Sequence, residues 1–177
     1  SDILWRNTAG NNTIWLGANA STQQYVSSVG THWSVVGIGD FNGDGKSDIL
    51  WRNTAGNNTI WLGANASTQQ YVSSVGTHWS VVGIGDFNGD GKSDILWRNT
   101  AGNNTIWLGA NASTQQYVSS VGTHWSVVGI GDFNGDGKSD ILWRNTAGNN
   151  TIWLGANAST QQYVSSVGTH WSVVSRP

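Results

Sequence analysis

The sequence predicts an all-β fold, a β-propeller built from four-stranded blades. The first observation is a 46-residue unit: residues 1–46, 47–92 and 93–138 are identical, and residues 139–174 copy its first 36 positions. A repeat length in the forties with several short strands per unit is typical of a propeller blade. The second observation is composition, because 24 glycines, one proline and 12 tryptophans accompany β-branched runs. Such a composition favours strands joined by tight turns.

The copies are identical even at positions expected in exposed loops, where separately evolving repeats would differ. We therefore interpret the chain as one blade copied by engineering, rather than as a very recent natural duplication. Any site in one unit then exists in every complete unit.

Each unit predicts four strands separated by polar turns. In the first unit they lie, in chain order, at Asp2–Asn7, Thr13–Gly17, Gln23–Ser28 and His32–Gly39, with turns at Thr8–Asn12 and Ala18–Thr22. The first two strands are apolar at successive positions, a pattern that fits burial on both faces between stacked blades. Gly37 and Gly39 suit an innermost strand, where backbones crowd around a central channel.

Trp5, Trp15 and Trp33 recur in every unit. We expect them to fill the space between blades, and the alternative is a platform on which sugar rings stack.

Composition excludes several classes of function. The chain has no cysteine, which excludes disulfides and thiolate metal sites. No stretch of about 18 apolar residues exists, so no membrane partner is expected. A net charge of −2 with isolated basic residues gives no case for nucleic acid.

The carboxylates are concentrated in one turn per repeat. All ten acidic residues are aspartates at equivalent positions of this turn, and the first complete copy, Asp40–Asp48, reads D-x-N-x-D-G-x-x-D. Oxygen-bearing side chains at positions 1, 3, 5 and 9, with glycine at 6, resemble the front of an EF-hand calcium loop. Position 12 is Trp51 instead of glutamate, and no flanking helices are expected, so we predict a calcium-binding hairpin loop. The alternative is an ion-free Asn/Asp/Gly turn.

The stretch VVGIGDFNGDGKSDILW, residues 35–51, resembles the FG-GAP/VCBS-type repeat of bacterial proteins and of integrin α-chain propellers. Integrin-like repeats continue into Gly-Ala-Pro where this chain has Trp51-Arg52-Asn53, which places it nearer the bacterial branch. The resemblance implies a propeller, commonly seven-bladed, with calcium between the first two strands of a blade and ligands on the opposite face. It also implies an extracellular or cell-surface parent. The calcium ligands that it implies are Asp40, Asn42, Asp44, Lys46 and Asp48, then Asp86, Asn88, Asp90, Lys92 and Asp94, then Asp132, Asn134, Asp136, Lys138 and Asp140.

The repeat boundary falls inside the calcium loop, so we expect one blade of the 177-residue chain to be split between residues 1–28 and 170–174. Pairing of these segments within the chain would give a four-bladed ring, and reciprocal pairing with a second copy would give an eight-bladed homodimer. We favour the homodimer, because a four-bladed ring needs a much wider wedge per blade and would leave voids between them. Three complete calcium loops per chain are expected.

We predict no catalytic activity, because the only carboxylates lie in the metal loops and none remains to orient a histidine beside a serine. The sequence favours a symmetric, calcium-stabilised scaffold that assembles with itself. The alternative is lectin-like, multivalent carbohydrate binding at blade junctions on the face opposite the calcium loops. Its candidate residues are Trp5, Arg6, Asn7, His32 and Trp33 and their copies.

Overall fold

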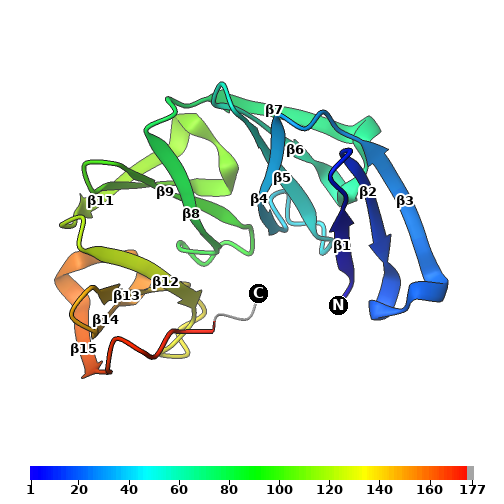
Figure 1. Cartoon of the computed structure of the whole chain (residues 1–177). Coiled ribbons are helices and arrows are strands. Elements are labelled where there is room, and N and C mark those ends of the chain that lie inside the picture. The colour runs from blue at the N-terminus through cyan, green and yellow to red at the C-terminus, as the bar shows by residue number, and fades with distance from the viewer. Residues whose placement is uncertain (175–177) are drawn as a thin grey trace.

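The computed structural model describes residues 1–174 and confirms an all-β fold of successive antiparallel sheets arranged as an open arc (Figure 1). Each sheet is one blade. Blade 1 has the strands β1 (Ile3–Arg6), β2 (Asn11–Trp15) and β3 (Gln23–Ser28). Blade 2 has β4 (Trp33–Gly39), β5 (Asp48–Asn53), β6 (Asn57–Trp61) and β7 (Gln69–Ser74). Blade 3 has β8 (Trp79–Gly85), β9 (Asp94–Asn99), β10 (Asn103–Trp107) and β11 (Gln115–Ser120). Blade 4 has β12 (Trp125–Gly131), β13 (Asp140–Asn145), β14 (Asn149–Trp153) and β15 (Gln161–Ser166).

The strands of each blade pair with their neighbours in chain order. In blade 2, β4 pairs with β5 in the register Trp33↔Asn53 to Gly39↔Asp48, with an irregularity between Val35 and Gly37. Blade 1 lacks an equivalent of β4 and has three strands. The four-stranded meander predicted from the repeat is therefore confirmed in blades 2, 3 and 4, and blade 1 has three of its four strands.

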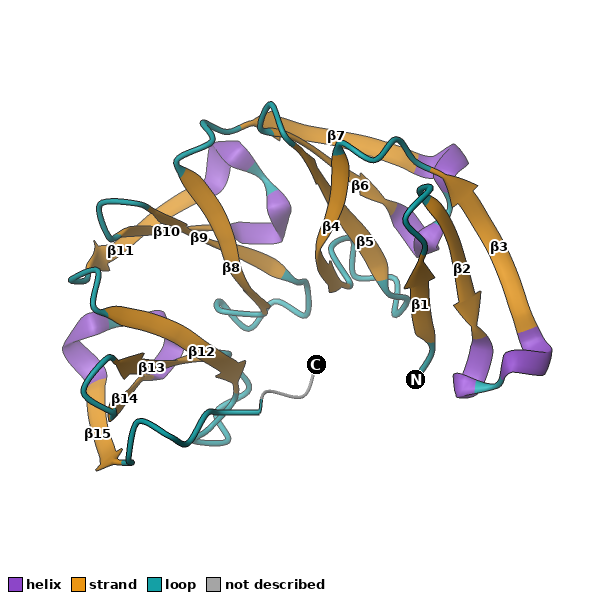
Figure 2. Ribbon diagram, viewed as in Figure 1, coloured by secondary structure: helices purple, strands orange, loops and turns teal. Residues whose placement is uncertain are grey.

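The predicted strand Thr13–Gly17 is shifted, because the structure places β2 at Asn11–Trp15. The strand ends early since Gly17 and Ala18 both have left-handed backbone angles, with φ of 59° and 57°. An extended strand cannot continue through two such residues. Two short 3₁₀ helices follow instead and connect the two outer strands of every blade (Figure 2). They are η1 (Leu16–Ala18), η2 (Ala20–Thr22), η3 (Leu62–Ala64), η4 (Ala66–Thr68), η5 (Leu108–Ala110), η6 (Ala112–Thr114), η7 (Leu154–Ala156) and η8 (Ala158–Thr160).

The hydrophobic core lies between blades. At the junction of blades 2 and 3 it combines Phe41, Leu50 and Ile60 of one blade with Ile95, Trp97 and Trp107 of the next. Trp97 is fully buried, and its ring centroid lies 5.2 Å from that of Trp107. These contacts confirm the space-filling role predicted for the Trp5-type and Trp15-type residues.

The innermost strands confirm the role predicted for glycine. Strands β4, β8 and β12 line the inner side of the arc (Figure 1). A Cβ atom on Gly37 would lie 2.7 Å from Cγ1 of Ile84, and one on Gly39 would lie 2.5 Å from Oγ of Ser93. Real Cβ atoms do not approach other atoms so closely, so glycine permits adjacent blades to touch.

Gly83→Ala should reduce the free energy of unfolding by about 1–3 kcal/mol, because the added methyl group overpacks the contact with blade 4. A Cβ on Gly83 would lie 2.7 Å from Cγ1 of Ile130. The matched control is Gly129→Ala, where the nearest atom is Cδ2 of Leu142 at an acceptable 3.4 Å. Urea unfolding of both variants checks this expectation, and equal losses would contradict it.

The two ends of the arc remain open within the described chain. The segment 170–174, predicted as a strand, pairs with no strand of the described chain. Ser175, Arg176 and Pro177 lie outside the described residues. Across residues 1–174, no helix is both long and apolar enough to span a membrane.

Candidate metal centre

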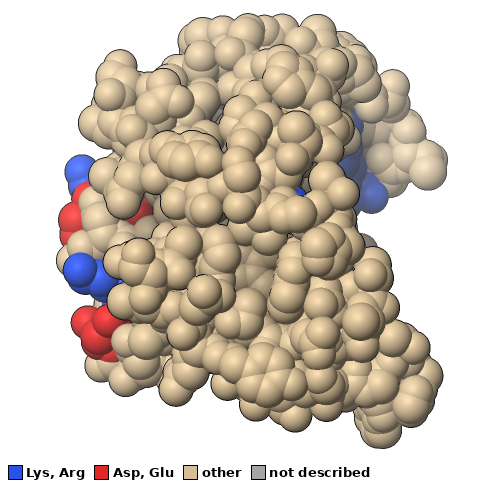
Figure 3. Space-filling model, turned by 90° about the vertical axis from the view of Figure 1, so that its left-hand side faces the viewer, with Lys and Arg blue, Asp and Glu red and all other residues tan. Residues whose placement is uncertain are grey.

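The aspartate-rich loops connect the innermost strand of a blade to its second strand. Loop 1 spans residues 40–47 between β4 and β5, loop 2 spans 86–93 between β8 and β9, and loop 3 spans 132–139 between β12 and β13. Aspartate and lysine side chains therefore gather along one side of the molecule (Figure 3).

In loop 1 the carboxylate of Asp40 organises the turn. Its Oδ1 accepts hydrogen bonds from the backbone N–H groups of Gly43 at 2.7 Å and Asp44 at 3.1 Å. Its Oδ2 accepts one from Gly45 at 2.8 Å. Gly43 and Gly45 have φ of 78° and 81°, which lets these amides turn inward. The backbone thus curls around the first carboxylate of the motif.

Asn42 and Asp44 complete the curl. Oδ1 of Asn42 accepts from the N–H of Asp44 at 3.0 Å, and Oδ1 of Asp44 accepts from the N–H of Lys46 at 2.9 Å. The amide Nδ2 of Asn42 donates to Oδ2 of Asp44 at 3.2 Å. Three oxygen-bearing side chains of the motif are therefore close together on an exposed loop, and loops 2 and 3 repeat these bonds.

Asp48 occupies a different environment from the other three. It is fully buried, and its two oxygens accept from the N–H groups of Phe41 at 2.9 Å and Gly63 at 2.7 Å. Within residues 1–174, no three carboxylate or imidazole groups converge as a metal-binding cluster. Asp48 therefore ties the start of the loop to the 3₁₀ turn at the outer edge of its blade.

Electrostatics also distinguish the buried aspartate from the exposed one. Burial raises the pKa of Asp94, the loop 2 equivalent of Asp48, although hydrogen bonds from Gly109 and Phe87 oppose this. The pKa of Asp132, the first aspartate of loop 3, is lowered, chiefly by the backbone N–H of Gly137. The carboxylate of Asp132 therefore holds its negative charge readily.

The donor set suits a hard cation. Calcium prefers oxygen ligands from carboxylates, amides, backbone carbonyls and water. Asp40, Asn42 and Asp44 offer such oxygens, and the exposed side of the loop leaves space for water. Because a carboxylate oxygen can accept more than one interaction, the hydrogen bonds to Asp40 do not exhaust its capacity.

The face opposite these loops carries the residues considered for carbohydrate binding. Trp5 is 45 % exposed, but its copies Trp51, Trp97 and Trp143 are fully buried. Oδ1 of Asn7 accepts from the N–H groups of Ala9 and Asn11 and so supports a turn. His32 is exposed, and its ring lies 6.1 Å from that of the half-buried Trp33.

Arginine has a structural role that the sequence did not reveal. Among residues 1–174, the guanidinium groups of Arg6, Arg52, Arg98 and Arg144 each donate five hydrogen bonds. For Arg52 the acceptors are the carbonyl groups of Gly56, Val75, Gly76 and Trp79 and Oδ1 of Asn58, at 2.9–3.1 Å. Its Cζ also lies 5.2 Å from the centroid of Trp97 in the next blade. Arg52 thus joins its own blade, the interblade connection and the neighbouring indole, and burial lowers its pKa.

The chain was also compared with known proteins. The FG-GAP-like repeat family matches residues 40–97 and 86–143, and the FG-GAP repeat family matches residues 124–163. Each match includes at least one aspartate-rich loop or the strands beside it. No curated protein matches the chain.

Proposed function

The chain belongs to the FG-GAP-like repeat family, and from this premise we propose that it is a calcium-stabilised propeller scaffold that assembles with a second copy of itself and has no catalytic activity. Its repeated blades form the scaffold. The observation that carries the proposal is the clustering of Asp40, Asn42 and Asp44 in an exposed loop that recurs in each complete unit.

Calcium would be held by the side chains of Asp40, Asn42 and Asp44 and by the carbonyl of Lys46. Asp48, the fifth predicted ligand, contributes indirectly by fixing Phe41 at the start of the loop. Without a cation, the carboxylates of Asp40 and Asp44 repel each other. An ion that binds only the folded loop therefore raises the stability of the fold by mass action.

Exhaustive chelation should lower the melting temperature by more than about 5 °C, because three occupied sites each stabilise the fold by mass action. Calorimetric titration of the stripped protein should return about three calcium ions per chain, one for each complete loop motif. The matched control carries Asp44→Ala, Asp90→Ala and Asp136→Ala together, and its melting temperature should not respond to the chelator. An unchanged melting temperature of the parent protein would refute calcium stabilisation.

Self-assembly is supported by apolar side chains that only the ends of the arc leave exposed. Ile3 is 39 % exposed in blade 1, whereas its copy Ile95 is fully buried. At the other end Phe133 is 49 % exposed, whereas its copy Phe87 is 5 % exposed. Between successive blades, the equivalents of Phe133 and Ile3 lie in one shared core. Phe133 at the blade 4 end of one copy could therefore pack with Ile3 at the blade 1 end of a second copy.

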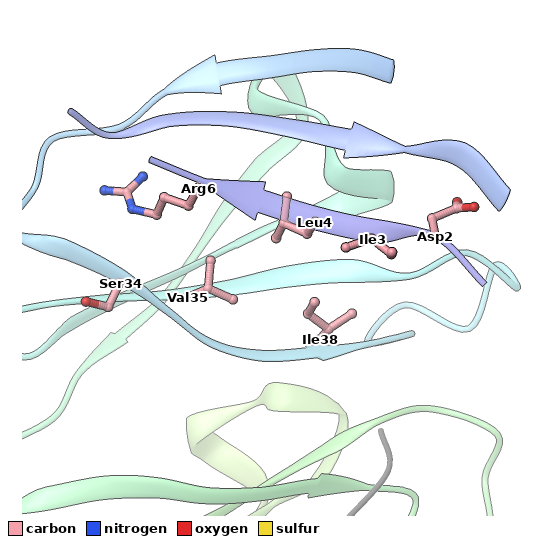
Figure 4. Close-up of a pocket in the computed structure, with 7 residues that line it drawn as sticks. All are labelled: Asp2, Ile3, Leu4, Arg6, Ser34, Val35 and Ile38. Carbon is pink, nitrogen blue, oxygen red and sulfur yellow. The ribbon is translucent and has the colours of Figure 1, made fainter. Parts of the chain in front are cut away.

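The edge of β1 supports the same proposal. A groove of about 610 Å³ runs between β1 and β4, lined on one side by Asp2, Ile3, Leu4 and Arg6 and on the other by Ser34, Val35 and Ile38 (Figure 4). In blade 2, β4 pairs with the edge of β5 that faces away from β6. The equivalent edge of β1 has no partner strand in the described chain, and the groove lies along that edge. The segment 170–174 has the sequence of His32–Val36. By the register of blade 2, Trp171 of a second copy would face Asn7, and Val173 would face Trp5.

The stacked arginines are also incomplete at one end. Arg6, Arg52 and Arg98 each lie over a tryptophan of the next blade, at 5.2 Å. Arg144 makes the same five hydrogen bonds, but the described chain places no indole beneath it. Trp5 of a second copy is the equivalent ring. Reciprocal pairing of this kind closes an assembly of two chains and eight blades.

Lectin-like binding is the weaker proposal. It needs accessible aromatic faces at the blade junctions, and the inner copies of Trp5 are buried in the core. Of the candidate residues, His32 and its copies remain exposed, each beside a tryptophan, which is half-buried in the case of Trp33, Trp79 and Trp125. A glycan array that includes His78→Ala as a control would test this function.

A further inference from the structure

Loop 3 differs from the two loops of identical sequence because it lies at the open end of the arc. Phe41 of loop 1 and Phe87 of loop 2 are each 5 % exposed, because each packs into the core shared with the next blade. Phe133 of loop 3 is 49 % exposed. The same side chain is thus a core residue in two loops and a surface residue in the third.

Successive loops are also joined to each other. The backbone N–H of Ser93 donates to the carbonyl of Asp40 at 2.7 Å, and that of Ser139 donates to the carbonyl of Asp86 at 2.6 Å. The first ligand residue of each loop is therefore held by the next loop along the arc. Across residues 1–174, the carbonyl of Asp132 receives no such bond. Ser1 of a second copy has the same place in its repeat as Ser93 and Ser139.

A side-chain contact accompanies this bond. A Cβ on Gly43 would lie 3.3 Å from Cγ of Lys92, and one on Gly89 would lie 3.4 Å from Cγ of Lys138. Each loop therefore packs against the lysine stem of the next. At Gly135, the equivalent position of loop 3, nothing lies within 4 Å in the described chain.

We infer that loop 3 is the part of the self-association surface that calcium controls, and that its partner is the blade 1 end of a second copy. This inference rests on the proposed function, because it requires both calcium binding and assembly. Loops 1 and 2 are held by the chain itself whether or not an ion is bound. Loop 3 keeps the bonds within the loop, but no following loop of the described chain holds it, so a bound ion would contribute more to fixing loop 3 than loops 1 and 2.

The physical link runs through two adjacent residues. Asp132 offers its carboxylate to the ion and its carbonyl to the partner, and Phe133 follows it directly. The N–H of Phe133 donates to Asp140 at 2.8 Å, which anchors only its backbone. A cation held by Asp132 and Asp136 would remove the repulsion between their carboxylates and restrict the loop. The exposed ring of Phe133 is then presented in the position that Phe87 occupies in an assembled junction, which lowers the entropy lost on association.

Linkage makes the effect reciprocal. If calcium at loop 3 strengthens association, association strengthens calcium binding at loop 3 by the same factor. Loops 1 and 2 should bind calcium with affinities that do not depend on assembly. Loop 3 has the same sequence as loops 1 and 2. A difference in calcium affinity between them would therefore reflect the position of each loop in the arc alone.

The test compares Asp136→Ala in loop 3 with Asp90→Ala in loop 2, using the full 177-residue chain. Sedimentation velocity across a dilution series, with calcium and with chelator, gives the dimer dissociation constant. Asp136→Ala should raise this constant at least about tenfold in calcium, within the usual range of coupling between sites. Asp90→Ala should leave it within about twofold of the parent while lowering the melting temperature, because it removes one stabilising ion.

Phe133→Ala and Phe87→Ala provide a second comparison that does not alter a metal ligand. Phe133→Ala should weaken association but leave the melting temperature nearly unchanged at concentrations where the parent chain is monomeric, whereas Phe87→Ala should lower the melting temperature there. Equal effects of Asp136→Ala and Asp90→Ala on the dissociation constant would overturn the inference. A parent chain that stays monomeric would refute the assembly itself, and a dimer that binds no calcium would refute the calcium-stabilised function.

Discussion

Arg98→Ala should lower the free energy of unfolding by about 2–4 kcal/mol, since one hydrogen bond to a charged group contributes about 1.5–3 kcal/mol and the five do not add. Arg98 donates to the carbonyl groups of Gly102, Val121, Gly122 and Trp125 and to Oδ1 of Asn104, at 2.9–3.1 Å. Its removal leaves these acceptors short of a donor and also removes the contact with the ring of Trp143. Chemical denaturation monitored by tryptophan fluorescence measures the loss.

Arg98→Lys is the control for charge. An ammonium group keeps the positive charge but cannot reproduce the planar fork that reaches several carbonyls at once. This variant should therefore still lose at least half of the stability lost by Arg98→Ala. Surface substitutions usually change the free energy of unfolding by no more than about 0.5 kcal/mol. If the free energy of unfolding of Arg98→Ala lies within this range of the parent value, the hydrogen-bonding role assigned to this arginine is wrong.

Deleting residues 170–177 should abolish the dimer and cause aggregation. The deletion removes the segment proposed to cover β1 of the partner, and an uncovered strand edge recruits other chains. Apolar side chains of this segment are largely exposed in the described chain, since Trp171 is 64 % and Val174 is 85 % exposed. Light scattering of fresh and aged samples would follow both the loss of the dimer and the growth of aggregates.

Deletion of residues 175–177 alone is the matched control and should leave the dimer intact, because the proposed pairing uses only residues up to Val174. A truncated chain lacking residues 170–177 that remained a soluble dimer would show that the copies associate in another way.

The fold was predictable because its evidence is local and repeated. The four strands per unit, the inner position of Gly37 and the packing role of the tryptophans follow from patterns inside 46 residues. The end of β2 was not predicted, because Ala18 adopts a left-handed conformation that alanine seldom takes. Such a conformation is imposed by the surrounding turn and leaves no mark in composition.

The candidate site was predictable only in part. The motif predicted the clustering of Asp40, Asn42 and Asp44, because alternate residues of a curled loop point to one side. It did not predict that Asp48 turns to the backbone of Phe41 and Gly63, since Gly63 lies 15 residues further along the chain. The carbonyls bound by Arg98 are likewise up to 27 residues away, and only the folded blade brings them within reach.

In the proposed dimer, the split blade also determines the order in which the protein folds and assembles. Blades 2, 3 and 4 pair strands that are close in sequence, such as β4 with β5, so each can form rapidly within one chain. In the proposed dimer, blade 1 gains its fourth strand only from residues 170–174 of another molecule. Its completion is then a bimolecular step that slows as the protein is diluted, while the other blades fold at a rate that dilution does not change. Newly made chains would therefore pass through a folded monomer whose two ends expose apolar side chains. The lifetime of this monomer would depend on the concentration of the protein.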